Sequence, residues 1–149
     1  MTDSRLVVLR WVAIAAAFVN LGIHLAMVPD HLAEKLYIGI LFVIGSALLG
    51  MVMVGLASDR DRLRTPAWIG GGLVCAVEFI LFVISRTAGL PQGYHEAWAA
   101  APEDLLGLAS LFVELVFIIG AAASLTATPR SAETATNWLP LHDRTAPLA

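Results

Sequence analysis

Four long apolar runs constrain this chain more than any other feature of its sequence. They are residues 6–28, 36–57, 67–85 and 105–127. Each run has roughly the 20 residues that a helix needs to cross about 30 Å of hydrocarbon. Only 14% of the 149 residues are charged, whereas about a quarter are charged in a soluble domain. The sequence therefore predicts an all-α transmembrane four-helix bundle, formed by one domain that covers residues 1–127.

Basic residues flank these runs unevenly. They lie before the first run (Arg5, Arg10), in the loop 58–66 (Arg60, Arg62, Arg64) and after the fourth run (Arg130), while the other two loops hold Lys35 and Arg86. Loops rich in Arg and Lys stay on the cytoplasmic side of a membrane. The pattern therefore predicts an antiparallel up-down bundle in the plasma membrane, multi-pass, with both termini cytoplasmic.

The connections between the runs predict where the helices end. Proline disfavours helix in the residue before it, so Pro29 is predicted to end the first helix at Val28. In the longer loop 87–101, the segment 94–101 combines alanines with Tyr94 and Trp98, which suits a short interfacial helix at headgroup level. The segment 128–149 is rich in Thr, Ala and Pro, and is predicted to be a mobile cytoplasmic tail.

The charge balance limits the partners that this chain can bind. Its net charge is −3 and its arginines are scattered over short loops, so it lacks the basic patch that nucleic acid requires. The expected partners are the lipid bilayer and, beyond it, a second copy of the chain or a larger membrane complex.

Two glutamates, Glu78 and Glu114, lie near the middle of apolar runs. A carboxylate at bilayer depth is costly, so it normally faces protein or a cavity and marks a functional site. Steps of three and four residues place both on faces made of small or polar residues. The four faces are Ala13, Ala17, Asn20 and His24; Gly39, Phe42, Ser46, Gly50 and Met53; Gly71, Cys75, Glu78, Phe82 and Ser85; and Gly107, Ser110, Glu114 and Ala121. Such faces allow close packing in lipid, so they are predicted to face the bundle interior.

The polar members of these faces come to one level of the predicted bundle. With a rise of ~1.5 Å per residue, Glu78, Glu114 and Asn20 all lie about 12 to 14 Å below the outer ends of their helices. His24 lies one turn above Asn20. We therefore predict that these four residues bind a divalent metal ion, for which imidazole and carboxylate are suitable ligands, or relay protons. In the alternative, two protonated glutamates serve only as interhelical hydrogen-bonding glue.

A second group of polar residues is expected at the outer surface. Asp30, His31, Glu34 and His95 are predicted to form a site through which a cation gains access, although His31 and His95 are also typical of solvated interfacial residues. Arg86 is expected either to extend to lipid headgroups or to pair with an outer acid, namely Glu34, Asp30 or Glu103.

The segment Ser85-Arg86-Thr87-Ala88-Gly89-Leu90-Pro91 resembles an S-R-T-x-G-L-P motif. This motif follows the third helix in a family of small, uncharacterised four-helix integral membrane proteins of bacteria, mainly actinobacteria. The resemblance extends to His24 with Pro29-Asp30-His31 upstream, and to Trp98, Pro102, Leu106-Gly107 and residues 110–114 downstream. It implies a membrane bundle and an ordered outer loop held by Arg86, Gly89 and Pro91, and it implies no activity.

Three classes of function remain open. The first is a membrane protein whose buried acidic and histidine cluster binds a cation or protons, in transport or sensing. The second is a non-catalytic accessory or assembly subunit of a larger membrane complex. The third is a redox enzyme with haem or quinone, but bis-histidine haem needs two histidines within the membrane, and His24 stands alone within the apolar runs. No plausible pair of nucleophile and base is found either, so the sequence favours a non-enzymatic protein.

Overall fold

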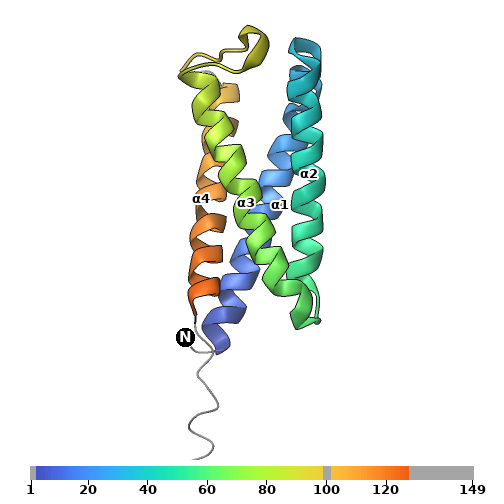
Figure 1. The fold of residues 1–149 in the computed structure, drawn as a ribbon, viewed down its shortest axis with the longest axis vertical. Helices are drawn as coiled ribbons and strands as arrows, with labels where there is room; N and C mark the ends of the chain where they lie inside the picture. The colour runs from blue at the N-terminus through green and yellow to red at the C-terminus, as the bar shows by residue number, and fades with distance from the viewer. Residues whose placement is uncertain (1–2, 99–101, 128–149) are drawn as a thin grey trace, which may run out of the picture.

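The computed structural model describes residues 3–98 and 102–127, and its long elements are all helical (Figure 1). The helices are α1 (Asp3–Glu34), α2 (Leu36–Ala57), α3 (Asp61–Arg86) and α4 (Pro102–Thr126), with a short 3-10 turn, η1, at Pro91–Gly93. All four helices are long and apolar enough to cross a membrane. The predictions of an all-α fold and of four potential membrane spans are therefore confirmed.

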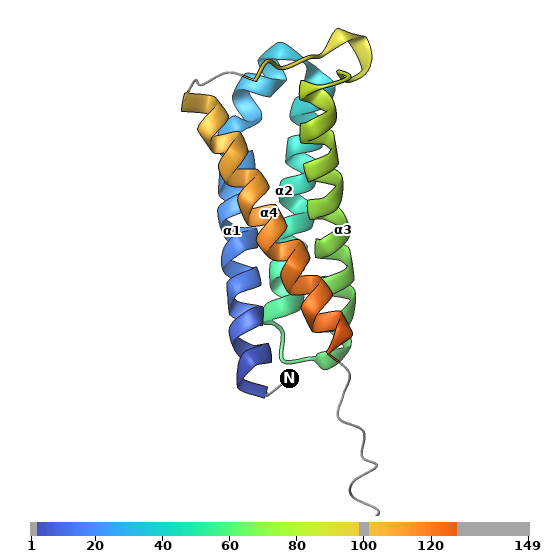
Figure 2. The same cartoon turned by 90° about the vertical axis from the view of Figure 1, so that its left-hand side faces the viewer.

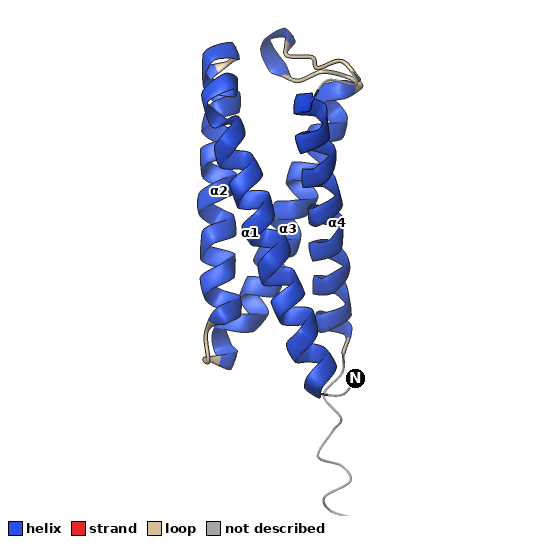
Figure 3. Ribbon diagram, turned by 180° about the vertical axis from the view of Figure 1, so that it is seen from behind, coloured by secondary structure: helices blue, strands red, loops and turns tan. Residues whose placement is uncertain are grey.

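The four helices form a closed ring. The α1 helix contacts α2 and α4, and α3 contacts the same two neighbours. The α1–α2 connection and the segment after α3 lie at one end, which we call the loop end, and the α2–α3 connection lies at the opposite end (Figures 1 and 2). The view from behind shows α1 crossing α3 near the middle of the bundle, so that α1 lies beside α2 toward the loop end and beside α4 toward the opposite end (Figure 3).

The first helix does not stop at Pro29, which corrects the predicted end at residue 28. Pro29 lies inside α1, and the helix ends at Glu34, before the extended backbone of Lys35. The residues after Pro29 contribute packing that offsets the proline: His31 is buried, and its ring lies 4.3 Å from that of Phe42. Tertiary contacts therefore override the local preference against helix at an internal proline.

The third helix begins six residues earlier than predicted, at Asp61. Arg64 connects this first turn to the chain before it, since its Nε donates to the backbone oxygen of Ser58 at 3.0 Å. Its Nη1 also pairs with Asp61 Oδ1 at 2.7 Å. These interactions stabilise a polar first turn of α3, which precedes the apolar run in the sequence.

The predicted helix over 94–101 is wrong for its described part, because residues 94–98 are not helical. Tyr94 instead forms an isolated antiparallel bridge with Leu90, and the backbone N–H of Glu96 donates to the oxygen of Ser85 at 3.0 Å. The backbone thus folds back on the end of α3 instead of making its own helical bonds. Residues 99–101 and the predicted tail 128–149 lie outside the described residues.

The apolar core lies in the half of the bundle near the α2–α3 connection. Its largest members include Trp68 and Phe117, whose ring centroids are 5.8 Å apart. Gly71 allows this contact, because a Cβ there would collide with Phe117 and Val52. Large apolar side chains such as Phe112 point outward, where a bilayer would cover them. None of the four predicted small and polar faces has an exposed member, so their inward orientation is confirmed.

Candidate functional site

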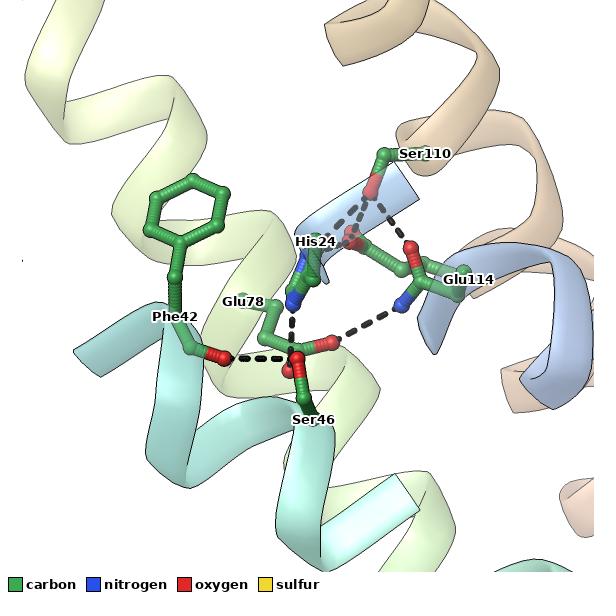
Figure 4. Close-up of polar contacts among 7 residues, drawn as sticks. His24, Phe42, Ser46, Glu78, Ser110 and Glu114 are labelled. Atoms are coloured by element: carbon green, nitrogen blue, oxygen red, sulfur yellow. Dashed lines mark hydrogen bonds and ion pairs between the residues drawn. The ribbon is translucent and has the colours of Figure 1, made fainter. Parts of the chain in front are cut away.

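Three helices bring polar side chains together inside the half of the bundle near the loop end (Figure 4). The α1 helix contributes His24 and Asn20, α3 contributes Glu78, and α4 contributes Ser110 and Glu114. His24 Nδ1 lies 3.5 Å from Glu78 Oε1, and His24 Nε2 lies 3.9 Å from Glu114 Oε1. The predicted convergence of His24, Asn20, Glu78 and Glu114 is thus observed. We call these four residues with Ser110 the polar cluster.

A chain of hydrogen bonds joins the two glutamates. Asn20 Nδ2 donates to Glu78 Oε2 at 3.0 Å, and Ser110 Oγ lies 2.6 Å from Asn20 Oδ1 and 2.8 Å from Glu114 Oε1. Ser110 has one hydroxyl hydrogen, so it can donate to only one of these two oxygens. The second contact is satisfied by a proton on Glu114. If the Asn20 amide is turned round, the proton lies on Glu78 instead. The chain is therefore complete with a proton on only one of the two carboxyls, and it places no requirement on the other.

Three buried atoms of the polar cluster have no hydrogen-bond partner. They are His24 Nδ1, Glu78 Oε1 and Glu114 Oε2. Ligand atoms of these three residues lie within 4.8 Å of one another, and Glu114 is only 2% exposed. A buried polar atom without a hydrogen-bond partner is costly. A cation or a hydrogen-bond donor that binds among these residues would reduce that cost.

Two small residues shape the cluster, and the site prediction did not include them. A Cβ at Gly45 on α2 would lie 2.5 Å from Glu78 Oε1 and 3.4 Å from His24 Nδ1, so the glycine leaves room for the carboxylate. Ser110 lies one helical turn before Glu114, a spacing visible in the sequence. Ser46, in contrast, donates to the backbone oxygen of Phe42 on its own helix at 2.8 Å. Among the residues that the structure describes, its hydroxyl makes no hydrogen bond to the polar cluster.

A cavity of about 320 Å³ adjoins the cluster. His24, Glu78 and Glu114 lie at one part of its wall, and Arg86, Tyr94 and Glu96 lie at its loop end. Most of the remaining wall is aliphatic, contributed by α2 and α3. The site is thus a small polar group of atoms at the base of an apolar chamber.

A second polar group closes the loop end of this chamber. Arg86 is only 7% exposed, forms an ion pair with Glu96, and places its guanidinium carbon 3.7 Å from the centroid of the Phe82 ring. Tyr94 donates to the same glutamate, and burial followed by the Glu96 carboxylate raises the pKa of this phenol, which keeps it a donor. The expectation that Arg86 extends to lipid headgroups is therefore wrong, and Glu96 was not among its predicted partners.

The predicted outer access site is not assembled. Asp30, Glu34 and His95 are exposed, whereas His31 is buried, which corrects its interpretation as a solvated residue. His31 Nδ1 lies 3.9 Å from Glu34 Oε2 and 3.3 Å from the Tyr94 hydroxyl. Among the residues that the structure describes, these four do not form a group of three possible metal ligands. His31 instead packs the end of α1 against the loop.

The segment 85–91 is held in a specific backbone conformation. Gly89 has φ +80°, a value that favours glycine, and its N–H donates to the Ile84 oxygen at 2.8 Å. The Pro91 oxygen accepts a hydrogen bond from the Tyr37 hydroxyl at 2.6 Å, which ties the segment to α2. The conformational reason for Gly89 is thus present in the structure.

The chain matches no protein-family model, no curated protein and no solved structure. The resemblance of residues 85–91 to a family of small bacterial membrane proteins therefore stays a prediction.

Proposed function

We propose that this chain is a multi-pass membrane protein whose polar cluster binds a cation or protons, in transport or sensing. The observation that carries this proposal is the convergence of His24, Glu78 and Glu114, whose ligand atoms lie within 4.8 Å of one another, while each residue also has one buried atom without a hydrogen-bond partner. Such atoms are expensive to bury. Hydrogen-bonding glue accounts for the contacts of Asn20 and Ser110, but it leaves one oxygen of each glutamate without a hydrogen-bond partner.

The bonded atoms of the cluster position these three. Asn20 donates to Glu78, and Ser110 contacts Glu114, so each carboxylate has one oxygen held by protein and one oxygen left over. In this proposal Asn20 is a positioning residue and not a ligand, since its Nδ2 donates and its Oδ1 lies against Ser110. His24 and the two free oxygens would coordinate the cation, and a divalent metal ion is one candidate.

The proposed setting is the plasma membrane, with antiparallel helices and both termini cytoplasmic. The arginines of the α2–α3 connection and of the N-terminus support this orientation, because basic loops are retained in the cytoplasm. The loop end, with Arg86 and Glu96, would then face outward, and the cluster would be nearer to that side.

The test is thermal unfolding of the purified protein with added cations and protons. A ligand that prefers the folded state raises the melting temperature by mass action. We expect the melting temperature to rise in a saturable way with at least one added cation, or as the pH is lowered within the range of about 8 to 5. This rise should be lost in Glu78→Gln and Glu114→Gln. Ser46→Ala is the matched control, because its hydroxyl bonds only to the backbone of its own helix among the described contacts.

Two results would contradict the proposal. One is a wild type that responds to no cation and to no change of pH. The other is a metal-free protein that co-purifies with a fixed membrane partner and keeps this association in both glutamine variants, which would favour an accessory subunit.

A further inference from the structure

The cavity next to the polar cluster is much more apolar than an inorganic cation needs. Its wall includes Leu41 and Ile44 of α2 and Leu73 and Val77 of α3, and these four side chains are also exposed on the outside of the bundle. They therefore mark a mouth between α2 and α3 that opens sideways, toward the region that lipid would occupy. A hydrated ion gains nothing from such a wall, whereas an apolar chain gains burial.

The base of the cavity has the opposite character. Glu78 Oε1 and Glu114 Oε2 are buried oxygens without a hydrogen-bond partner, and the hydrogen-bond chain needs a proton on only one of the two carboxyls, so the other is free to ionise beside a cation. His24 Nδ1 is a third acceptor when the Nε2 hydrogen points toward Ser110, 3.5 Å away. Three acceptors, with one carboxyl ionised when a cation binds, match a primary ammonium group, which has three N–H donors and one positive charge.

The spacing of the three residues also suits an ammonium. Hydrogen bonds of about 2.8 Å let one nitrogen bridge atoms up to roughly 5.6 Å apart. Ligand atoms of His24, Glu78 and Glu114 lie within 4.8 Å of one another, which is inside this limit.

We propose that this cavity binds a cationic amphiphile from the bilayer, with its primary ammonium at His24, Glu78 and Glu114 and its apolar chain along α2 and α3. The proposal rests on the proposed cation site and names its ligand class. A volume of about 320 Å³ holds about ten groups of the size of a water molecule. A linear alkylamine of roughly eight carbons therefore fits, with the ammonium as one group and the chain as the rest.

The ammonium can belong to a free alkylamine or to an aminophospholipid, and the two sources differ in charge. The lipid also carries a phosphate, which the Glu78 and Glu114 side chains would repel. We therefore expect the free amine to bind and the lipid to bind weakly or not at all. Binding of both would still support ammonium recognition and would identify the lipid as a second source.

The experiment measures melting temperature and calorimetric binding in phosphatidylcholine nanodiscs, whose lipid headgroup has no N–H. The probes are octylamine, butylamine, octyltrimethylammonium and octanol, with an aminophospholipid as a separate arm. Octylamine should bind at least tenfold more tightly than each of the other three soluble probes, because butylamine lacks the chain, the quaternary amine lacks donors and octanol lacks charge. Equal binding of octanol and octylamine would overturn the proposal, since it would show an apolar site only.

Two variants separate the mouth from the cluster. Ile44→Trp should close the mouth and abolish octylamine binding while the response to small inorganic cations remains. Ile40→Trp is the matched control, because Ile40 is similarly exposed on α2 but does not line the cavity. If Ile44→Trp binds octylamine as the wild type does, the lateral mouth is wrong. If small cations stabilise the wild type and no alkylamine does, the amphiphile is wrong and the cation site stands.

Discussion

The same four helices enclose an apolar core in one half of the bundle and a polar cluster beside a cavity in the other half. Near the α2–α3 connection, Trp68 and Phe117 pack against alanines and leucines. Near the loop end, His24, Glu78 and Glu114 meet beside a cavity. The first half supplies the dispersion contacts that hold helices together in lipid. The second half, in contrast, keeps buried polar atoms that have no hydrogen-bond partner.

The glycines show the same difference at the level of single atoms. In the packed half, the missing Cβ of Gly71 is replaced by the Phe117 ring, so the space is filled with apolar atoms. In the half near the loop end, the missing Cβ of Gly45 is replaced by a carboxylate oxygen of Glu78. Small residues thus serve close packing in one half and admit a charge-bearing group in the other.

The largest effect on stability is expected from Phe117→Ala in the packed half. The ring is fully buried, so its removal leaves a cavity and should cost about 3–5 kcal/mol of unfolding free energy. Cation binding to the surviving folded protein should be unchanged. Reversible unfolding in detergent measures the loss, and Phe112→Ala, at an outward position of the same helix, should change little. A lost cation response in a folded Phe117→Ala protein would show that the halves are not independent.

A smaller effect is expected from Gly89→Val in the outer loop. The positive φ costs about 1–3 kcal/mol for a branched residue, and a Cβ would lie 3.2 Å from the Tyr94 oxygen. Gly93→Val is the comparison, because it has a similar φ of +72° but no atom within 4 Å of its Cβ. Both should lower the melting temperature, Gly89→Val more than Gly93→Val. Unchanged expression and melting temperature for Gly89→Val would contradict the ordered loop.

Gly45→Ala should lower the stability less than Phe117→Ala or Gly89→Val does, but it should affect the polar cluster strongly. The added methyl would lie 2.5 Å from Glu78 Oε1 and must displace the carboxylate. We expect a loss of about 1 kcal/mol or less, and cation binding that is at least tenfold weaker. Gly22→Ala is the control, since nothing lies within 4 Å of its Cβ. The same affinity for cations in Gly45→Ala and wild type would remove Gly45 from the site.

The convergence of the cluster could be predicted from sequence because it depends on local geometry. Helical rise and a step of three to four residues fix the depth and face of Asn20, His24, Glu78 and Glu114 once four spans are assigned. The pairing of Arg86 with Glu96 could not be predicted in this way. It depends on how the segment after α3 folds back, which is decided by several distant contacts together.

The burial of His31 and the continuation of α1 past Pro29 have the same origin. The local sequence favoured a helix end before Pro29 and a solvated His31. Packing of the His31 ring against Phe42 and Tyr94 outweighed both preferences. The cavity likewise depends on the separation of α2 and α3, about which a single helix says nothing. The sequence thus predicted which residues each helix turns toward the bundle interior, whereas the cavity between the helices could be found only in the structure.

The smallest effect on stability is expected from cysteines placed at the two ends, which test the side that each half faces. Asp61 and Gln92 are exposed at opposite ends, and replacing Asp61 removes only a surface ion pair with Arg64, worth about 0–1 kcal/mol. The native Cys75 is buried and should react little. In intact cells an impermeant thiol reagent should label Gln92→Cys at once and Asp61→Cys only after lysis. The opposite pattern would reverse the proposed orientation in the membrane, and the cavity near the loop end would then be nearer to the cytoplasm.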